Sequence, residues 1–405
     1  CLSVAASVPL PGDQRCDVVG TENIPLVQPP TAVRVWFSES VEPYGEGLWV
    51  IGPDGGRSDR GPVRVSPFAE SIDVDATQTG TYLVHWQIVA ADTHPARGSF
   101  TFVVRQPGGV LASVGNSDLR AEASAVAPIG LALGVVARWL HFLGYALGFG
   151  VLAFWLFIIP FAAKSRPLVE EAASRIWLLV NVGIVLLVVA EPIALLGQTA
   201  SLGPGAIFNP DIVSAALDSS FGRALGVRLG APFLLWLLVG VARNGSRRSL
   251  VIAMGLALAL GFFDGTTAHA RGVEPVWLSL IVNAAHVSAL GFWLGGLAGL
   301  VAVWPFLQGV ADAGVRNSIA DRFGRGAIVS VLVLIATGAV MAALHLRGPA
   351  DLLDTSYGVV LAAKIAFVVA FLLFVGLMRA ARAGPRLWVA ECVVIAGVLI
   401  LAGLL

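Results

Sequence analysis

The stretch that decides the fold reads VWLSLIVNAAHVSALGFWLGGLAGLVAVWP and covers residues 276–305. None of its residues is Asp, Glu, Lys or Arg. A helix needs about 20 residues to cross a hydrocarbon core about 30 Å thick, so this stretch is long enough to span a membrane. It contains one histidine, His286. We therefore predict a transmembrane helix that carries a single imidazole.

Seven further apolar stretches of similar length predict the same structure. The whole chain is 57% hydrophobic and only 13% charged, which excludes a strongly basic nucleic-acid binder and a long disordered tail. We predict an all-α polytopic membrane domain of eight transmembrane helices at residues 127–405, surrounded by the lipid bilayer and with no nucleic-acid partner. The other seven stretches lie near residues 135–160, 175–198, 221–242, 248–268, 323–345, 357–379 and 386–405.

The first hundred residues have a different pattern. Val33, Val35 and Phe37 alternate with other residues, and the turn sequence 52–56 follows the apolar run 48–51. Residues 81–90 and 99–105 read as two more strands. Short alternating runs between Gly, Pro and Asp turns are typical of an all-β sandwich. We predict a Greek-key β-sandwich at residues 1–105, followed by a linker at 106–126 that is rich in Gly, Ser and Ala.

The net charge of zero conceals a polarised chain. Residues 1–125 contain 8 Lys+Arg against 14 Asp+Glu, a net of −6, and residues 126–405 contain 18 against 12, a net of +6. Basic residues gather in alternate loops, and the positive-inside rule makes those loops cytoplasmic. The β domain and the C-terminus are then both outside. The basic residues concerned are Lys164, Arg166, Arg175, Arg243, Arg247, Arg248, Arg316, Arg322, Arg325, Arg379, Arg382 and Arg386.

An internal repeat relates the two halves of the membrane domain. The segment 218–222 (DSSFG) resembles 354–358 (DTSYG), and a basic residue follows at matching positions, Arg228 and Lys364. His141 and His286 each precede a Pro-Phe pair by the same interval. We predict that repeat one (127–270) and repeat two (271–405) are parallel four-helix copies related by a pseudo-twofold axis along the membrane normal.

Six histidines are the main candidate ligands, and with this orientation none of them is cytoplasmic. His286 lies about 16 Å along its helix from Pro275, near the midplane. An ionisable side chain inside a bilayer is costly and usually functional. We predict that His141 and His286 form an intramembrane metal site between the repeats, with His269 at its outer mouth.

Other polar residues are weaker candidates. We expect Glu191 to be a polar side chain beside a helix kink and His345 to be a polar side chain at the membrane rim. Both are secondary candidates as metal ligands. Arg228 and Lys364 either reach the lipid headgroups or act as counter-ions inside the membrane.

Asp92 and His94 form a candidate site in the β domain. They lie two residues apart, so an extended backbone points them to the same side. A carboxylate and an imidazole suit Cu(II), and imidazole also suits Zn and Ni. The alternative is that Asp92 caps the turn before Pro95. The three methionines all lie in the membrane domain, which excludes a Met-rich Cu(I) site in the β domain.

Two known families share these motifs. Residues 36–43 (WFSESVEP), 85–95 (HWQIVAADTHP) and 98–102 (GSFTF) are similar to CopC-type copper-binding β-sandwiches. Residues 138–141 (RWLH), 267–270 (TAHA), 292–296 (FWLGG) and 322–325 (RFGR), with His286 and Lys364, resemble CopD-type copper-resistance proteins. The order of the two parts resembles CopC–CopD fusions of the bacterial cytoplasmic (inner) membrane.

This resemblance implies that Asp92 and His94 hold Cu(II). It also implies a third ligand, an N-terminal histidine, that residues 12–17 lack. Cys1, Cys16, His85 or the free terminus takes its place, or the outer site is degenerate.

The function we predict is copper binding outside the membrane and copper transport into the cell through the intramembrane histidines, as Cu(I) or Cu(II). Periplasmic copper chaperones or a larger membrane complex are the expected partners. The sequence has no ATP-binding loop and no hydrolytic constellation, so we do not predict an enzyme.

Two alternatives stay open. Two histidines on facing helices are also what a bis-imidazole b-type haem requires, which predicts an electron-transfer protein. The second alternative is that the chain is an accessory subunit or scaffold of a larger membrane complex, with a degenerate copper site.

Overall fold

The computed structural model describes most of the chain. The described residues are 4–9, 15–18, 24–26, 28–37, 40–90, 95–105, 128–159, 166–201, 204–243, 246–266, 275–310, 313–346, 348, 351–354, 356–380 and 386–403. They divide into two compact units, Cys1–Leu131 with Leu195–Ala224, and Ala132–Ala194 with Leu225–Leu405. Each unit is described by itself below. The predicted linker 106–126 lies outside the described residues.

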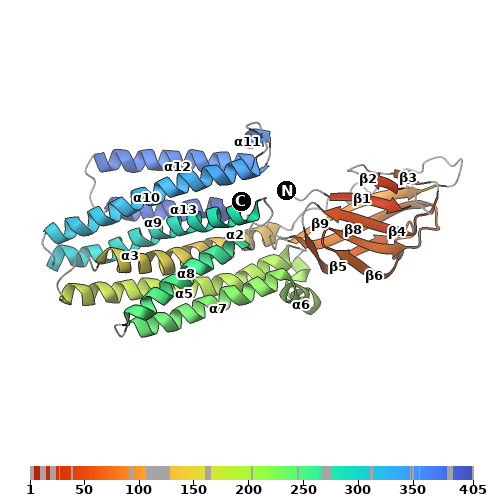
Figure 1. Cartoon of the computed structure of the whole chain (residues 1–405). Coiled ribbons are helices and arrows are strands. Elements are labelled where there is room, and N and C mark those ends of the chain that lie inside the picture. Colours follow the sequence, from red (N-terminus) through yellow and green to blue (C-terminus); the bar gives the residue numbers. More distant parts are fainter. Residues whose placement is uncertain are drawn as a thin grey trace. The chain divides into compact units, whose positions relative to one another are not determined.

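The first unit contains two β-sheets (Figure 1). The five-stranded sheet has the order β2-β1-β4-β7-β6 and the four-stranded sheet the order β3-β9-β8-β5. All neighbouring pairs are antiparallel except β3 and β9. The strands are β1 (Val4–Pro9), β2 (Arg15–Val18), β3 (Ile24–Leu26), β4 (Ala32–Phe37), β5 (Val41–Ile51), β6 (Asp59–Ser66), β7 (Ala69–Val74), β8 (Gly80–Ala90) and β9 (Pro95–Val104).

The period-two pattern explains how the two sheets share one core. Val33, Val35 and Phe37 are buried while the residues between them are not, as the sequence predicts for β4. The core residues Tyr82 and Phe102 stack with ring centroids 4.9 Å apart. The prediction of a β-sandwich is therefore confirmed at the level of two facing sheets, and its Greek-key connectivity stays a prediction.

Residues 195–224 complete the first unit. Helix α6 (Pro210–Asp218) begins at Asn209, whose side chain accepts a hydrogen bond from the Asp211 amide. Its Ala216 belongs to a small buried cluster with Tyr44 and Val89.

The second unit is helical, and every predicted apolar stretch contains a helix (Figure 1). Helices α5 and α7 begin or end in the first unit. The helices are α2 (Pro128–Tyr145), which continues through the π-helix η1 (Ala146–Gly150) into α3 (Val151–Phe157), then α5 (Arg166–Ala200), α7 (Ser220–Arg243), α8 (Arg247–Thr266), α9 (Val276–Val310), α10 (Ala313–His345), α12 (Ser356–Ala380) and α13 (Arg386–Gly403). The short segments η2 (Pro204–Ala206) and α11 (Asp351–Asp354) lie between them.

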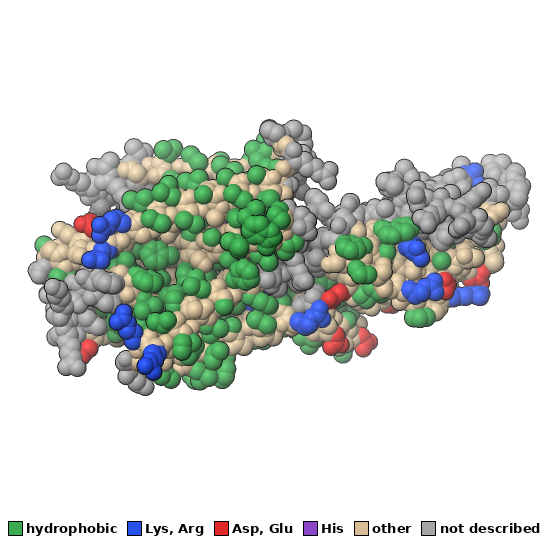
Figure 2. All heavy atoms as spheres, in the orientation of Figure 1, with side chains coloured by type: hydrophobic (Ala, Val, Ile, Leu, Met, Phe, Trp, Pro, Cys, Tyr) green, Lys and Arg blue, Asp and Glu red, His purple; other side chains and the backbone are tan. Residues whose placement is uncertain are grey.

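Five of the described helices are long and apolar enough to cross a membrane, namely 128–157, 172–200, 221–243, 276–309 and 313–344. The chain is thus a multi-pass membrane protein. The count of eight spans stays a prediction, and α8, α12 and α13 lie in the three remaining predicted stretches. Leu178, Phe233 and Leu332 are more than half exposed, which in water would favour aggregation. Figure 2 shows hydrophobic side chains along this flank and basic ones near one end, as a lipid-facing surface requires.

Small residues let η1 and α9 approach closely at the centre of the second unit. A Cβ at Gly150 would overlap the Gly291 carbonyl oxygen, and a Cβ at Gly295 would overlap the Ala146 carbonyl oxygen. Contacts of this kind bring two backbones together where apolar burial alone gives no driving force. The first helices of the two repeats therefore meet through residues without side chains.

A substitution of Gly295 tests this contact. We expect Gly295→Ala to lower the unfolding temperature by several degrees, because the helices have to move apart to admit the methyl group. The matched control is Gly309→Ala on the same helix, where a Cβ meets open space. Thermal unfolding of both purified variants in detergent gives the comparison. Equal unfolding temperatures for the two would show that the η1–α9 contact tolerates a larger separation.

A buried carboxyl group makes the first unit sensitive to pH. Glu70 on β7 is fully buried, and neither oxygen has a hydrogen-bond partner among the described residues. Its side chain lies beside Gly47, whose φ of +67° belongs to an irregular part of β5. Burial raises the pKa of Glu70 to about 8, because the charged form loses its hydration without gaining a partner.

The sign of the resulting pH dependence follows from that shift. Glu70 stays protonated in the folded state up to about pH 8, whereas the unfolded state loses the proton near pH 4.5. Stability therefore falls as pH rises between these values, by a total on the order of 4 kcal/mol. We expect Glu70→Gln to remove this loss, so that β7 amides of the full chain exchange more slowly than wild type at pH 8 and equally at pH 4.5. Exposed Glu46→Gln is the control, and an unchanged ratio at the two pH values would contradict the assignment.

Candidate functional site

His141 on α2 lies at the centre of a buried polar cluster. Its Nδ1 is 2.9 Å from Glu191 Oε1 on α5, and its Nε2 is 2.9 Å from Asp264 Oδ2 on α8. Arg228 on α7 completes the cluster by donating from Nε to Asp264 Oδ1 over 3.2 Å. Each of the four long helices of repeat one thus contributes one ionisable side chain. We call Glu191, His141, Asp264 and Arg228 the quartet.

The hydrogen bonds of the quartet are those expected of charged groups. An ionised carboxylate only accepts hydrogen bonds, so an imidazole held between two carboxylates has to donate from both ring nitrogens. His141 is then an imidazolium, and the quartet contains two positive and two negative charges. His141, Glu191 and Asp264 are 7%, 2% and 4% exposed. Mutual compensation is what makes such buried charges tolerable in an apolar surrounding.

The next helical turn supports the position of His141. Tyr145 ends α2 at the start of the π-helix, and its hydroxyl is 3.4 Å from Ser288 Oγ on α9. A Cβ at Gly261 on α8 would overlap that hydroxyl group. Glycine at this position lets the tyrosine lie between α8 and α9.

His286 occupies the corresponding position in repeat two, with different partners. Its Nδ1 is 2.8 Å from Thr337 Oγ1 on α10. Each histidine bonds a residue on the next long helix of the chain. The sequence separation is 50 residues from His141 to Glu191 and 51 from His286 to Thr337. Lys364 on α12 is close enough to His286 to act on it electrostatically. Among the described residues no carboxylate is hydrogen-bonded to His286, whereas two are bonded to His141.

The threonine determines which nitrogen of His286 is available. Thr337 Oγ1 donates to the Val333 carbonyl oxygen over 2.6 Å, so its proton is already used. His286 Nδ1 therefore donates to Thr337, and the lone pair of the neutral ring lies on Nε2. Among the described residues no hydrogen bond reaches Nε2 of His286. His286 thus has a free ligand nitrogen, whereas both nitrogens of His141 are engaged.

The other predicted site residues are only partly placed. Asp92, His94 and His269 lie outside the described residues, as does Cys1, and for Cys16 and His345 only the backbone is described. His85 on β8 stacks on Trp49 with ring centroids 5.0 Å apart. Burial, and then the positive charge of Arg57, lower the pKa of His85, which favours the neutral ring that a metal needs.

The structure differs from the sequence expectations for two side chains. Glu191, expected as a polar residue beside a kink, is a buried partner of His141 rather than only a neighbour of Pro192. Arg228 acts as a counter-ion and does not reach for headgroups. Asp264 was not predicted, although a lone carboxylate within the apolar stretch 248–268 was the signal that could have revealed it.

The two histidines do not bond each other. Their hydrogen bonds stay within their own repeats, and in the described part of the chain no three His, Cys, Asp or Glu side chains are arranged to hold a metal ion. A joint site between the repeats therefore stays a prediction.

Three regions of the chain match domains of known protein families. Residues 21–105 match the CopC domain, residues 129–276 match the copper resistance protein D-like N-terminal domain, and residues 317–405 match copper resistance protein D. Copper resistance protein C of Xanthomonas campestris pv. juglandis is 30% identical over 88 residues, which are 20% of this chain and 69% of that protein. The chain belongs to the CopC–CopD copper-resistance family.

One relative extends over both domains. Copper transport protein CutJ of Bacillus subtilis is 26% identical over 372 residues, 88% of this chain and 65% of CutJ. The chain thus spans slightly less than two thirds of that relative. Among solved structures, CopC from Methylosinus trichosporium OB3b matches 23% of this chain and 91% of its own, at 20% identity and a TM-score of 0.20.

A double-mutant cycle tests the charge compensation in the quartet of this CopC–CopD protein. We expect Asp264→Asn to lower the free energy of unfolding by about 3–5 kcal/mol, because it leaves Arg228 without its buried counter-charge. Arg228→Met combined with Asp264→Asn should cost less than the sum of the two single changes. Thermal or denaturant unfolding in detergent gives the three values. Strict additivity would mean that the two side chains do not interact in the folded protein.

Proposed function

We propose that this protein binds copper outside the cytoplasmic membrane of a bacterium and carries it across that membrane into the cell. The observation that carries the proposal is that His286 bonds Thr337 through Nδ1, while its Nε2 has no hydrogen-bond partner among the described residues of these apolar helices. An imidazole nitrogen of this kind is a ligand for Cu(I) and Cu(II). The matched copper-resistance domains and the name of the relative CutJ support copper as the cargo.

In this proposal the two repeats have different roles. Copper binds first at His286, because His141 has to break a hydrogen bond to Glu191 or Asp264 before it offers a nitrogen. The quartet then takes part in a second step, in which a displaced carboxylate and the released imidazole become ligands. His269 accepts the ion at the outer mouth, and His345 is a secondary ligand there.

The outer domain supplies the copper in this scheme. Asp92 and His94 are the proposed Cu(II) ligands, and His85 is a candidate third ligand because its ring is neutral and half-buried. The β domain and the C-terminus lie outside, as the distribution of arginines over alternate loops favours. Periplasmic copper chaperones are the proposed donors, and a larger membrane complex is the alternative partner.

A haem protein is the less favoured candidate. Bis-imidazole ligation needs a free nitrogen from each histidine. Both ring nitrogens of His141 already lie 2.9 Å from carboxylate oxygens. The quartet would have to be broken to bind a haem iron.

Copper accumulation in copper-limited bacterial cells that express the full chain tests the proposal. We expect His141→Ala with His286→Ala to abolish uptake. We expect His286→Ala alone to reduce it at least about tenfold, because loss of a metal–ligand bond worth about 1.4 kcal/mol weakens binding tenfold. Thr337→Val should also reduce uptake since it removes the acceptor that orients the ring, while Thr337→Ser should retain it. Elemental analysis of the cells gives the copper content.

The contradicting outcomes are distinct. Wild-type uptake in the double histidine variant would exclude the intramembrane route. A stoichiometric Soret band in the visible spectrum of the purified protein, with no bound copper, would favour the haem protein instead.

A further inference from the structure

A groove lies on the flank of the second unit between α5 and α7, away from the quartet. It has a volume of about 270 Å³ and is lined by Asn181 from α5 and by Trp236, Leu237, Val239, Gly240, Val241 and Arg243 from α7. Trp236, Leu237 and Val241 are about half exposed. In a multi-pass membrane protein such a surface faces lipid, and the mostly apolar lining of the groove suits an acyl chain.

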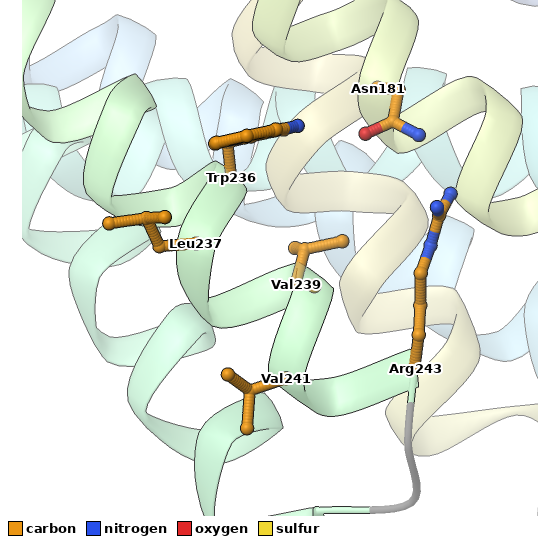
Figure 3. Close-up of a pocket in the computed structure, with 7 residues that line it drawn as sticks. Asn181, Trp236, Leu237, Val239, Val241 and Arg243 are labelled. Carbon is orange, nitrogen blue, oxygen red and sulfur yellow. The ribbon is translucent and has the colours of Figure 1, made fainter.

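Three side chains with polar groups line this groove, Asn181, Trp236 and Arg243. Figure 3 shows the guanidinium of Arg243 and the indole nitrogen of Trp236 both directed toward Asn181. Arg243 ends α7, and its guanidinium lies 5.9 Å from the ring centroid of Trp177. Stacking on one face leaves the N–H groups at the edge of the guanidinium available. All three side chains are hydrogen-bond donors.

No described carboxylate balances this arginine. Among the described residues the ring of Trp177 is the one partner found for Arg243, and neither Asn181 nor the Trp236 indole makes a hydrogen bond there. An arginine without a described counter-charge, beside the N–H groups of an amide and an indole, is complementary to a phosphate group. Anionic lipids concentrate at the cytoplasmic leaflet, which is where the positive-inside rule places Arg243.

We propose that this groove binds an anionic phospholipid, with its phosphate on Arg243 and Asn181 and one acyl chain along Trp236 and Leu237. A second groove repeats the pattern at the side of α3 and α8. It has a volume of about 210 Å³, and Arg247 accompanies its apolar lining of Leu156, Phe157, Val251 and Met254. The combination of an apolar groove and an arginine therefore occurs twice in the same unit.

Gly240 gives a way to fill the groove without disturbing the protein. A Cβ at Gly240 meets nothing within 4 Å, so Gly240→Leu places its side chain in the open space of the groove. Gly230 lies on the same helix, is equally open and does not line the groove, so Gly230→Leu is the matched control. For the charge, Arg243→Gln is compared with Arg248→Gln, which removes a nearby arginine that lines neither groove.

The experiment titrates the purified full chain in detergent with dioleoyl-phosphatidylglycerol and counts bound lipids by native mass spectrometry. We expect Arg243→Gln and Gly240→Leu each to weaken binding of one lipid about tenfold, the scale of a charge-assisted hydrogen bond, while Gly230→Leu and Arg248→Gln bind like wild type. Dioleoyl-phosphatidylcholine should bind the wild-type protein more weakly. Unfolding temperatures of all four variants check that they are folded.

Two results would overturn the proposal. Equal affinity of folded Arg243→Gln and wild type for phosphatidylglycerol would show that the groove does not recognise the headgroup. Displacement of the lipid by millimolar inorganic phosphate would show that the site binds a free anion rather than a lipid.

Discussion

The absence of water around the transmembrane helices is the constraint on which the second unit depends. A charge buried there needs a counter-charge from within the protein, and the quartet supplies one for each of its members. Because its four side chains come from four different helices, satisfying the charges also fixes which helices are neighbours. His141 joins α2 to α5 and α8, and Arg228 joins α7 to α8. The polar contacts thus specify which helices pack together. Apolar side chains cannot do this, because they are solvated equally well by lipid.

The two repeats use the same histidine position for different purposes. In repeat one the imidazole is held between carboxylates and helps to hold the helices together. His286 bonds Thr337 where His141 bonds Glu191, and no described carboxylate bonds it, so its ring is neutral with no described partner for Nε2. If the predicted four-helix repeat holds, one copy uses the histidine in a charge network and the other leaves it able to act as a ligand. The glycines of η1 and α9 bring these two helical segments together without adding side chains between them.

The sequence predicts the elements well because they depend on local periodicity. Val33, Val35 and Phe37 alternate as a half-buried strand requires, and every long apolar stretch contains a helix. The partners within the site are harder to predict, since a side chain's neighbours depend on helix rotation and on which helices pack together. Glu191 next to Pro192 looks like a kink residue until α2 brings an imidazole to it, and the sequence marks Asp264 as a lone carboxylate without showing that His141 and Arg228 are its partners. The repeat identified both histidines, but it did not show that their partners differ.

Charge around the two histidines also bears on how copper is selected along the proposed route. The quartet is neutral overall, and His286 has the positive Lys364 nearby, so neither histidine offers a net negative charge to an approaching cation. Hard cations such as Ca²⁺ and Mg²⁺ are bound by about six or more oxygens, and Glu191 and Asp264 use three of their four carboxylate oxygens on His141 and Arg228, which leaves too few. What remains available is an imidazole nitrogen, which suits copper far better than it suits a hard cation. Selection on this route therefore rests on ligand chemistry at His286 rather than on electrostatic attraction.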